Sequence, residues 1–164
     1  MTPLDAAIAW IQKGFSPVPI PHGSKRPILK GWEQLEIATE VAPQYFNGTQ
    51  QNIGVHLGDK FGSTDVDCDC PEAITAARGL LPETGLIFGR QSRPFSHFFY
   101  RSDPPVRTEQ FIDPLDHSTL AELRGLSSDG SVGLQTVVPP SIHETGEQVR
   151  FEQGFAGERF GQAR

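Results

Sequence analysis

The chain has 164 residues and a formal net charge of −6 at pH 7. This charge argues against indiscriminate binding to polyanions, because such binding rests on Lys and Arg side chains that neutralise phosphates. A chain of this length buries roughly two thirds of its extended surface and fits one domain. Its composition, with 37% hydrophobic residues, 17 Gly and 14 Pro, excludes extensive disorder and favours short elements joined by many turns.

The N-terminal segment predicts a helix followed by an edge strand. Thr2, Pro3 and Asp5 are typical of a helix start, and Gly14 is placed to end the helix. The next segment, "FSPVPI" (15–20), predicts an edge strand, because its prolines cannot donate hydrogen bonds to a neighbour.

A basic loop and a second strand follow. The loop "PHGSKRPILKGW" (21–32) carries Lys25, which either meets phosphates or belongs to an ordinary solvated turn. The alternation in "NIGVHL" (52–57) predicts a half-buried strand with His56 on its polar face.

The segment "STDVDCDC" (63–70) predicts a strand with three acids on one face. Side chains at every second position of a strand point the same way, so Asp65, Asp67 and Asp69 would stand in a row with roughly 7 Å between neighbours. Either this face is open to water, or it binds hard cations such as Mg²⁺ or Mn²⁺, which prefer carboxylate oxygens. Cys68 and Cys70 are expected to be reduced and buried, since two thiols so close in sequence do not easily pair.

A helix from Pro71 to about Gly79 is predicted next, and five more strand-like segments follow. They are "GLIFG" (85–89), "HFFYR" (97–101), "TLAELRG" (119–125), "VGLQTVV" (132–138) and "QVRFE" (148–152). Few helices and about eight strands predict an α+β domain with mixed or antiparallel sheets and flanking helices.

Two segments could complete a site around the aspartates. Glu122 and Arg124 share the polar face of their predicted strand, either as an ordinary surface ion pair or as a third carboxylate beside a cation that suits metal and phosphate. His97 follows the basic segment "GRQSRPFS" (89–96), where Arg90 and Ser92 could join it in donating to a phosphate.

Two prolines before "SIHETG" predict a shaped turn that presents Ser141 and His143 at the rim of a site.

The sequence contains no nucleophile elbow, no phosphate-binding loop of the G-x-x-x-x-G-K-[ST] type and no dinucleotide fingerprint. Hydrolases with such an elbow and proteins built on these nucleotide loops are therefore not favoured.

Taken in order, "GSKRPILKGW", "NIGVHLG", "DVDCDCPEA", "GRQSRPFSHFFY" and "AELRG...VGLQTVVPPSIHETGE" resemble the bifunctional primase/polymerase domain of the archaeo-eukaryotic primase superfamily. The resemblance covers roughly residues 5 to 152. It implies the primase-polymerase fold and template-directed nucleotidyl transfer with Mg²⁺ or Mn²⁺, in which nucleoside triphosphates are joined to a 3′ hydroxyl on a DNA template and primer.

The resemblance also implies roles for individual residues. Aligned without a gap, the metal-binding pair of the family falls on Asp67 and Asp69, with Asp65 as an additional acid, while the register Asp65 with Asp67 stays open. The third acid of the family falls on Glu122, and its histidine, which grips the triphosphate, falls on His97. From chemistry and position, we expect further phosphate contacts from Arg124, Arg90 and Lys25.

Two other functions stay open: a non-catalytic module that binds nucleotides or nucleic acid, and a metal-dependent nuclease. We expect a catalytic domain over residues 1–152 and a polar tail or linker over 153–164, with a helicase domain or protein as a possible partner. The sequence has no secretion signal and no run of about 18 apolar residues, so we expect a cytoplasmic protein that does not enter a membrane.

Overall fold

The computed structural model of the chain describes residues 1–153 and 162–163, so most of the predicted tail, residues 154–161 and 164, lies outside the described residues. The helices of the described part are α1 (Pro3–Gln12), α2 (Ala42–Tyr45), α3 (Pro71–Leu80) and the short 3₁₀ helix η1 (Trp32–Gln34). The strands are β1 (Pro17–Pro21), β2 (Gln51–Leu57), β3 (Ser63–Cys68), β4 (Ile87–Arg90), β5 (Arg93–Ser102), β6 (Glu109–Ile112), β7 (Thr119–Arg124), β8 (Leu134–Val138), β9 (Arg150–Gln153) and β10 (Gln162–Ala163).

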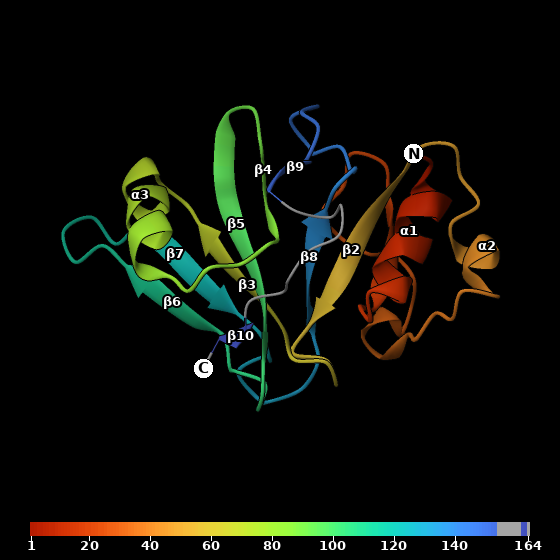
Figure 1. Cartoon of the computed structure of the whole chain (residues 1–164), viewed down its shortest axis with the longest axis horizontal. Coiled ribbons are helices and arrows are strands. Elements are labelled where there is room, and N and C mark those ends of the chain that lie inside the picture. The colour runs from red at the N-terminus through yellow and green to blue at the C-terminus, as the bar shows by residue number, and fades with distance from the viewer. Residues whose placement is uncertain (154–161, 164) are drawn as a thin grey trace.

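These strands form two sheets that stand beside one another, with α1 and α2 flanking the smaller sheet and α3 flanking the larger one (Figure 1). The smaller sheet has the order β1-β2-β8, and the larger has the order β6-β7-β3-β5-β4-β9, with β10 added alongside β5. Neighbouring strands are antiparallel except for the pair β5 and β10. The α+β class with antiparallel sheets and few helices is therefore confirmed.

Helix α1 begins where the sequence predicts. The Thr2 hydroxyl accepts from the Asp5 N–H, and the Asp5 carboxylate accepts from the Thr2 N–H, which completes a capping box. Beyond the helix, Gly14 has a φ of 78°, and its N–H donates to the carbonyl of Ile11. Glycine adopts this left-handed conformation without steric cost, which ends the helix.

The described part of the chain has two hydrophobic cores, and the larger one lies between α1, the small sheet and the inner face of the large sheet. Trp10 of α1 packs edge-on against Phe99 of β5, with ring centroids 6.1 Å apart, and both belong to one buried cluster with Val55 of β2. A second cluster, which includes Phe98 and Ala77, lies under α3 on the outer face of the large sheet. The large sheet is thus covered by apolar contacts on both faces along part of its length.

Strand β2 corrects one prediction. The sequence predicted a half-buried strand with His56 on a polar face, but residues 52–57 are buried throughout and His56 is only 2% exposed. The loop before β2 covers this face, and Trp32 stacks on the His56 ring with centroids 5.6 Å apart. Burial, as the largest effect, lowers the pKa of His56 and favours the neutral ring.

The two cysteines are free, and Cys68 is buried as expected, whereas Cys70 is only half-buried. Cys70 instead precedes α3, where its Sγ accepts from the N–H of Ala73 at 3.4 Å.

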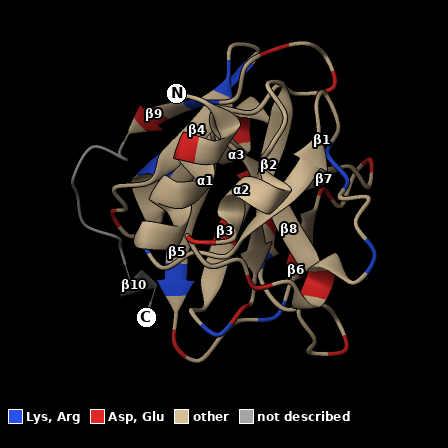
Figure 2. Cartoon of the chain, turned by 90° about the vertical axis from the view of Figure 1, so that its right-hand side faces the viewer, with Lys and Arg blue, Asp and Glu red and all other residues tan. Residues whose placement is uncertain are grey.

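No helix in the part of the chain that the structure describes has both the length and the apolar character needed to cross a membrane. Acidic and basic residues alternate along the chain in the view of Figure 2.

Candidate active site

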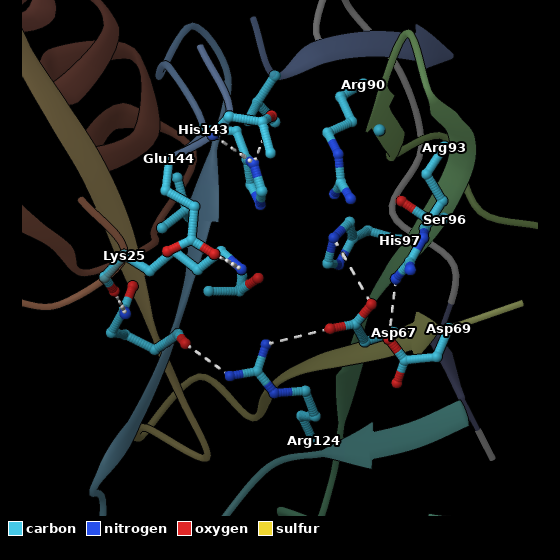
Figure 3. A pocket seen from close by; sticks show the side chains of 16 residues that line it. Lys25, Asp67, Asp69, Arg90, Arg93, Ser96, His97, Arg124, His143 and Glu144 are labelled. Carbon is cyan, nitrogen blue, oxygen red and sulfur yellow. Dashed lines mark hydrogen bonds and ion pairs between the residues drawn. The ribbon is translucent and has the colours of Figure 1, made fainter. Parts of the chain in front are cut away.

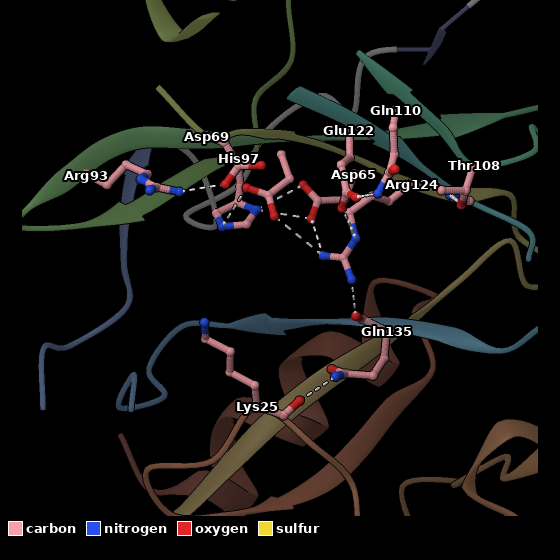
Figure 4. Close-up of polar contacts among 12 residues, drawn as sticks. Lys25, Asp65, Asp69, Arg93, His97, Thr108, Gln110, Glu122, Arg124 and Gln135 are labelled. Atoms are coloured by element: carbon pink, nitrogen blue, oxygen red, sulfur yellow. Dashed lines mark hydrogen bonds and ion pairs between the residues drawn. The ribbon is translucent and has the colours of Figure 1, made fainter. Parts of the chain in front are cut away.

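The site is built on β3, which lies between β5 and β7 in the large sheet. Asp67 stands opposite His97 of β5 and Glu122 of β7, while Asp65 stands opposite Arg124 of β7. Directly opposed residues of antiparallel strands point to the same face. Asp65, Asp67 and Glu122 therefore share one face of the sheet with His97 and Arg124, on the side of β8 (Figure 4).

Asp65 is completely buried and pairs with two basic groups. Its Oδ2 lies 3.1 Å from Nδ1 of His97 and 3.5 Å from Nη1 of Arg124, and the Thr136 side chain of β8 also hydrogen-bonds to it. Burial raises the pKa of Asp65, but the charges of His97 and Arg124 and the hydrogen bonds outweigh it and hold the pKa below its ordinary value. The buried carboxylate is therefore kept ionised.

The pKa of Asp67 is shifted in the opposite direction, above its ordinary value. Its side chain is 21% exposed, its Oδ1 lies 3.7 Å from Nε2 of His97, and its Oδ2 lies 3.7 Å from Nη1 of Arg124. Burial is the largest effect and raises the pKa of Asp67, and the neighbouring charges of Asp65 and Asp69 add to it, while His97 and Arg124 compensate only in part. A bound cation would offset the repulsion among these carboxylates.

His97 lies between the two aspartates. Burial lowers the pKa of His97, but the charges of Asp65 and Asp67 outweigh it and raise the pKa above its ordinary value. The ring also stacks on Phe88 of β4, with centroids 4.8 Å apart and planes 10° from parallel. This stacking fixes the ring, so that one nitrogen meets Asp65 and the other lies on the side of Asp67.

The ligand atoms of Asp65, Asp67 and His97 all lie within 4.8 Å of one another, an arrangement that could hold a metal ion. Two carboxylates and an imidazole are a donor set that Mn²⁺ and related divalent ions accept. The residues present therefore fit a divalent cation at this position.

Asp69 lies past the end of β3 and is drawn away from this group. Its Oδ1 accepts from Nη1 of Arg93 at 2.8 Å, and both side chains are about one third exposed. The three acids that the sequence places in one row are thus separated by their partners. Asp65 and Asp67 share His97 and Arg124, and Asp69 pairs with Arg93 (Figure 4).

Glu122 lies beside the cluster on the same face. Its carboxylate accepts from Nε2 of Gln110 on β6 and lies 3.7 Å from Nε of Arg124. It does not line the cavity described below. The structure thus brings Glu122 next to Asp67 but leaves it outside the cavity lining, although Arg124 of the same strand is part of that lining.

A cavity of about 500 Å³ opens over Asp67, Asp69 and His97 (Figure 3). One wall comes from the large sheet and its β4–β5 turn, where Arg90 and Arg93 contribute guanidinium groups. The opposite wall comes from β8 and the loops beside it, and it includes Lys25, Gln135, Thr136, His143 and Glu144. A space of this size, lined by cations at its rim and carboxylates at its base, suits a phosphorylated ligand accompanied by a metal ion.

Several of the residues predicted to bind the substrate line this cavity, and two of them do not. Arg90, Lys25 and His143 line it, whereas Ser141 and Ser92 do not. Ser141 is 2% exposed, and its hydroxyl accepts from the N–H of Ile53 and donates to the Ile53 carbonyl. The N–H and the hydroxyl of Ser92 both donate to Glu147.

Sequence reasoning missed three residues that shape the cavity. Glu147 holds the β4–β5 turn through Ser92 and through Arg90, whose Nε lies 3.2 Å from it. The carbonyl of Gln135 accepts from Nη2 of Arg124 at 2.9 Å, and Thr136 bonds Asp65. The alternation of "VGLQTVV" predicted the strand but gave no sign of which residues face the acids.

Comparison with known proteins agrees with this geometry. The sequence model of the family described as "Bifunctional DNA primase/polymerase, N-terminal" matches residues 7–160. The match confirms the resemblance drawn from the sequence motifs. A search of curated proteins finds no match to this chain.

Proposed function

The chain belongs to the bifunctional DNA primase/polymerase family, and from this premise we propose that its cavity is the active site of a template-directed nucleotidyltransferase. The observation that carries the proposal is the placement of Asp67 and His97 at the base of a cavity rimmed with cations, with the buried Asp65 beside them and in contact with His97. The substrates implied by the family are nucleotides and DNA.

We assign the metal-binding pair to Asp65 and Asp67 rather than to Asp67 and Asp69. Asp65 and Asp67 contact the same histidine, whereas Asp69 is engaged by Arg93 beyond the strand. The position of Glu122 opposite Asp67 supports a role for it as the third acid. A divalent Mg²⁺ or Mn²⁺ bound by these residues would neutralise phosphate charge and favour ionisation of the attacking hydroxyl.

The residues of the chain orient the other reactant. The carboxylates would then hold the metal without the imidazole, and His97, whose Nδ1 is held by Asp65, would donate from Nε2 to a phosphate oxygen of the incoming triphosphate. Arg90 and Lys25, on opposite walls of the cavity, would bind the remaining phosphate oxygens. The 3′ oxygen of the primer would then bond to the α-phosphorus as the bond to pyrophosphate breaks, and the hydroxyl proton would pass to water.

A primer-extension assay tests this function. The protein is incubated with a primed DNA template, all nucleoside triphosphates and Mn²⁺, and we expect longer products from the wild type and none from Asp67→Asn. Shorter products would identify a nuclease, and unchanged primer with the wild type would leave only a binding module. Either result would overturn the proposal.

A further inference from the structure

The loop of residues 21–32 presents an unusual surface for this acidic chain. It carries Lys25, Arg26 and Lys30, three of the 14 Lys and Arg residues of the protein within six positions, and it contains no acid. Between these cations lie two exposed apolar side chains, Ile28 at 81% and Leu29 at 40% exposure. We call Lys25–Lys30 the basic-apolar loop.

The N-terminal end of this loop is anchored to the small sheet. The buried Asn52 of β2 donates to the carbonyl of Ser24 at 2.9 Å, and Nε2 of Gln135 on β8 donates to the carbonyl of Lys25 at 2.7 Å. The Ser24 hydroxyl also accepts from the N–H of Arg26. These bonds fix the base of the loop at the wall of the cavity, so that its exposed residues project from a defined place.

The basic-apolar loop begins at the wall of the cavity. Lys25 lines the cavity and reaches toward it from the wall opposite His97 (Figure 4), and the rest of the loop follows Lys25 directly in the chain without lining the cavity itself. A polynucleotide whose reacting end lies in the cavity has to leave through this opening. The rim on the Lys25 side would be one of the first surfaces it meets.

The chemistry of the loop fits such a strand. Among the described residues, neither Arg26 nor Lys30 forms an ion pair, and Lys25 pairs with the exposed Glu144 at 2.8 Å. Phosphates can therefore bind two of the cations without displacing a partner, and the third by exchange with one exposed carboxylate. Single-stranded segments also expose base faces, which pack on nearby side chains, and exposed Ile28 and Leu29 would supply an apolar surface for them.

We propose that the basic-apolar loop binds a single-stranded segment of the nucleic-acid substrate at the mouth of the active site. Arg26 and Lys30 contact phosphates, and Ile28 packs against a base. This inference rests on the proposed function for the direction in which the strand runs, but the binding itself requires neither metal nor nucleotide.

Fluorescence anisotropy with a labelled 20-residue thymidine oligonucleotide, measured without metal over a series of NaCl concentrations, tests the loop. We expect Arg26→Gln and Lys30→Gln each to weaken binding and to reduce the slope of log K against log [NaCl] by about 0.7, the value for one lost phosphate contact. Ile28→Ser should weaken binding roughly fivefold and leave the slope unchanged, because it removes apolar contact and no charge.

Lys60→Gln is the matched control, since Lys60 is an exposed lysine in the β2–β3 turn that pairs with Glu36. The inference fails if Lys60→Gln weakens binding as much as Lys30→Gln, if the loop variants bind like the wild type, or if the wild type does not bind at low salt. If the wild type extends primers and the loop variants bind the oligonucleotide normally, the role of the loop is wrong and the proposed function stands. If binding depends on the loop but the wild type does not extend primers, the role of the loop stands and the proposed function is wrong.

Discussion

At the scale of single residues, Asp65 and Asp67 differ although they stand two positions apart on one strand. Asp65 is buried against His97 and Arg124, which keep its pKa low, whereas the pKa of Asp67 is raised by burial and by neighbouring acids. The negative charge of Asp65 therefore stabilises the folded protein, and that of Asp67 opposes it in the absence of metal.

The isosteric substitutions Asp65→Asn and Asp67→Asn should separate these effects. Without metal, we expect Asp65→Asn to lower the free energy of unfolding by about 3 kcal/mol, because it leaves buried cationic groups without their partner. We expect Asp67→Asn to leave stability unchanged or raise it. Urea unfolding near pH 7 measures both values, and a marked loss of stability in Asp67→Asn would show that its charge is structural.

The same pair predicts a dependence on pH. Because the pKa of Asp65 is lower in the folded than in the unfolded chain, its stabilising contribution is present above the ordinary carboxyl pKa of about 4 and is lost as the pH falls through the folded value. Wild type and Asp65→Asn should therefore converge in stability as the pH is lowered below 4. A constant difference down to pH 2 would contradict this assignment.

Catalysis gives a separate comparison. Asp65→Asn and Asp67→Asn should both abolish primer extension, and Asp69→Asn should retain most of it, because Asp69 bonds Arg93 outside the proposed metal group. The amount of folded protein is checked by circular dichroism in each case. If Asp69→Asn is inactive and Asp65→Asn active, the metal-binding register is Asp67 with Asp69.

At the scale of secondary-structure elements, the loop after β8 is tied to β2 by Ser141. This hydroxyl accepts from the Ile53 N–H at 2.9 Å and donates to the Ile53 carbonyl at 3.2 Å, and it is buried. The loop that follows carries His143 and Glu144 to the cavity wall. Ser141 thus acts on the site through the position of its loop.

Ser141→Ala should lower the free energy of unfolding by about 1–3 kcal/mol, because it leaves a buried N–H and carbonyl without their side-chain partner. Thermal unfolding measures this loss, and Ser128→Ala, at an exposed serine, is the control. At a temperature where the variant is folded, we expect kcat for nucleotide addition to stay near the wild-type value. A large fall in kcat with stability unchanged would assign Ser141 to the substrate instead.

Much of the fold can be predicted at this scale, and the misses have physical causes. The helices beginning at Pro3 and Pro71 carry clear start signals, and alternation marks most strands. Strand β6 was missed because all four of its residues are exposed, so it shows no buried face, and α2 was missed because four residues are too few for a helical period. The two-sided burial of β2 depends on Trp32, twenty or more residues earlier in the chain.

The candidate site was predictable in its residue types and less so in its pairings. Strand periodicity placed all three aspartates on one face, but it could not show that β3 ends at Cys68 or that Arg93 would engage Asp69. Glu122 was expected near the aspartates, and the strand register places it opposite Asp67. Its hydrogen bond to Gln110 depends on the unpredicted β6.

At the scale of the whole molecule, the site lies where the two sheets meet. The large sheet supplies the acids and His97, while the small sheet and its loops supply the opposite wall. A ligand that binds the acids therefore binds a place formed only in the folded chain, and its binding free energy adds to the stability of the whole domain.

Mn²⁺ should raise the melting temperature of the wild type. At a concentration 100 times its dissociation constant, the added stability is about 2.7 kcal/mol, which corresponds to roughly 5–10 °C for a domain of this size. Differential scanning fluorimetry measures the shift, and removal of the metal with a chelator should reverse it. The doubly substituted Asp65→Asn, Asp67→Asn protein should show no comparable shift; an equal shift would place the ion elsewhere.

Arg124 connects the electrostatics of the site to its width. Its guanidinium lies near Asp65 and Asp67 on the large sheet and donates to the carbonyl of Gln135 on the small one. The group that balances the acids is thus also a brace between the two walls of the cleft. One guanidinium therefore serves both the charge balance of the acids and the contact between the two walls of the cavity.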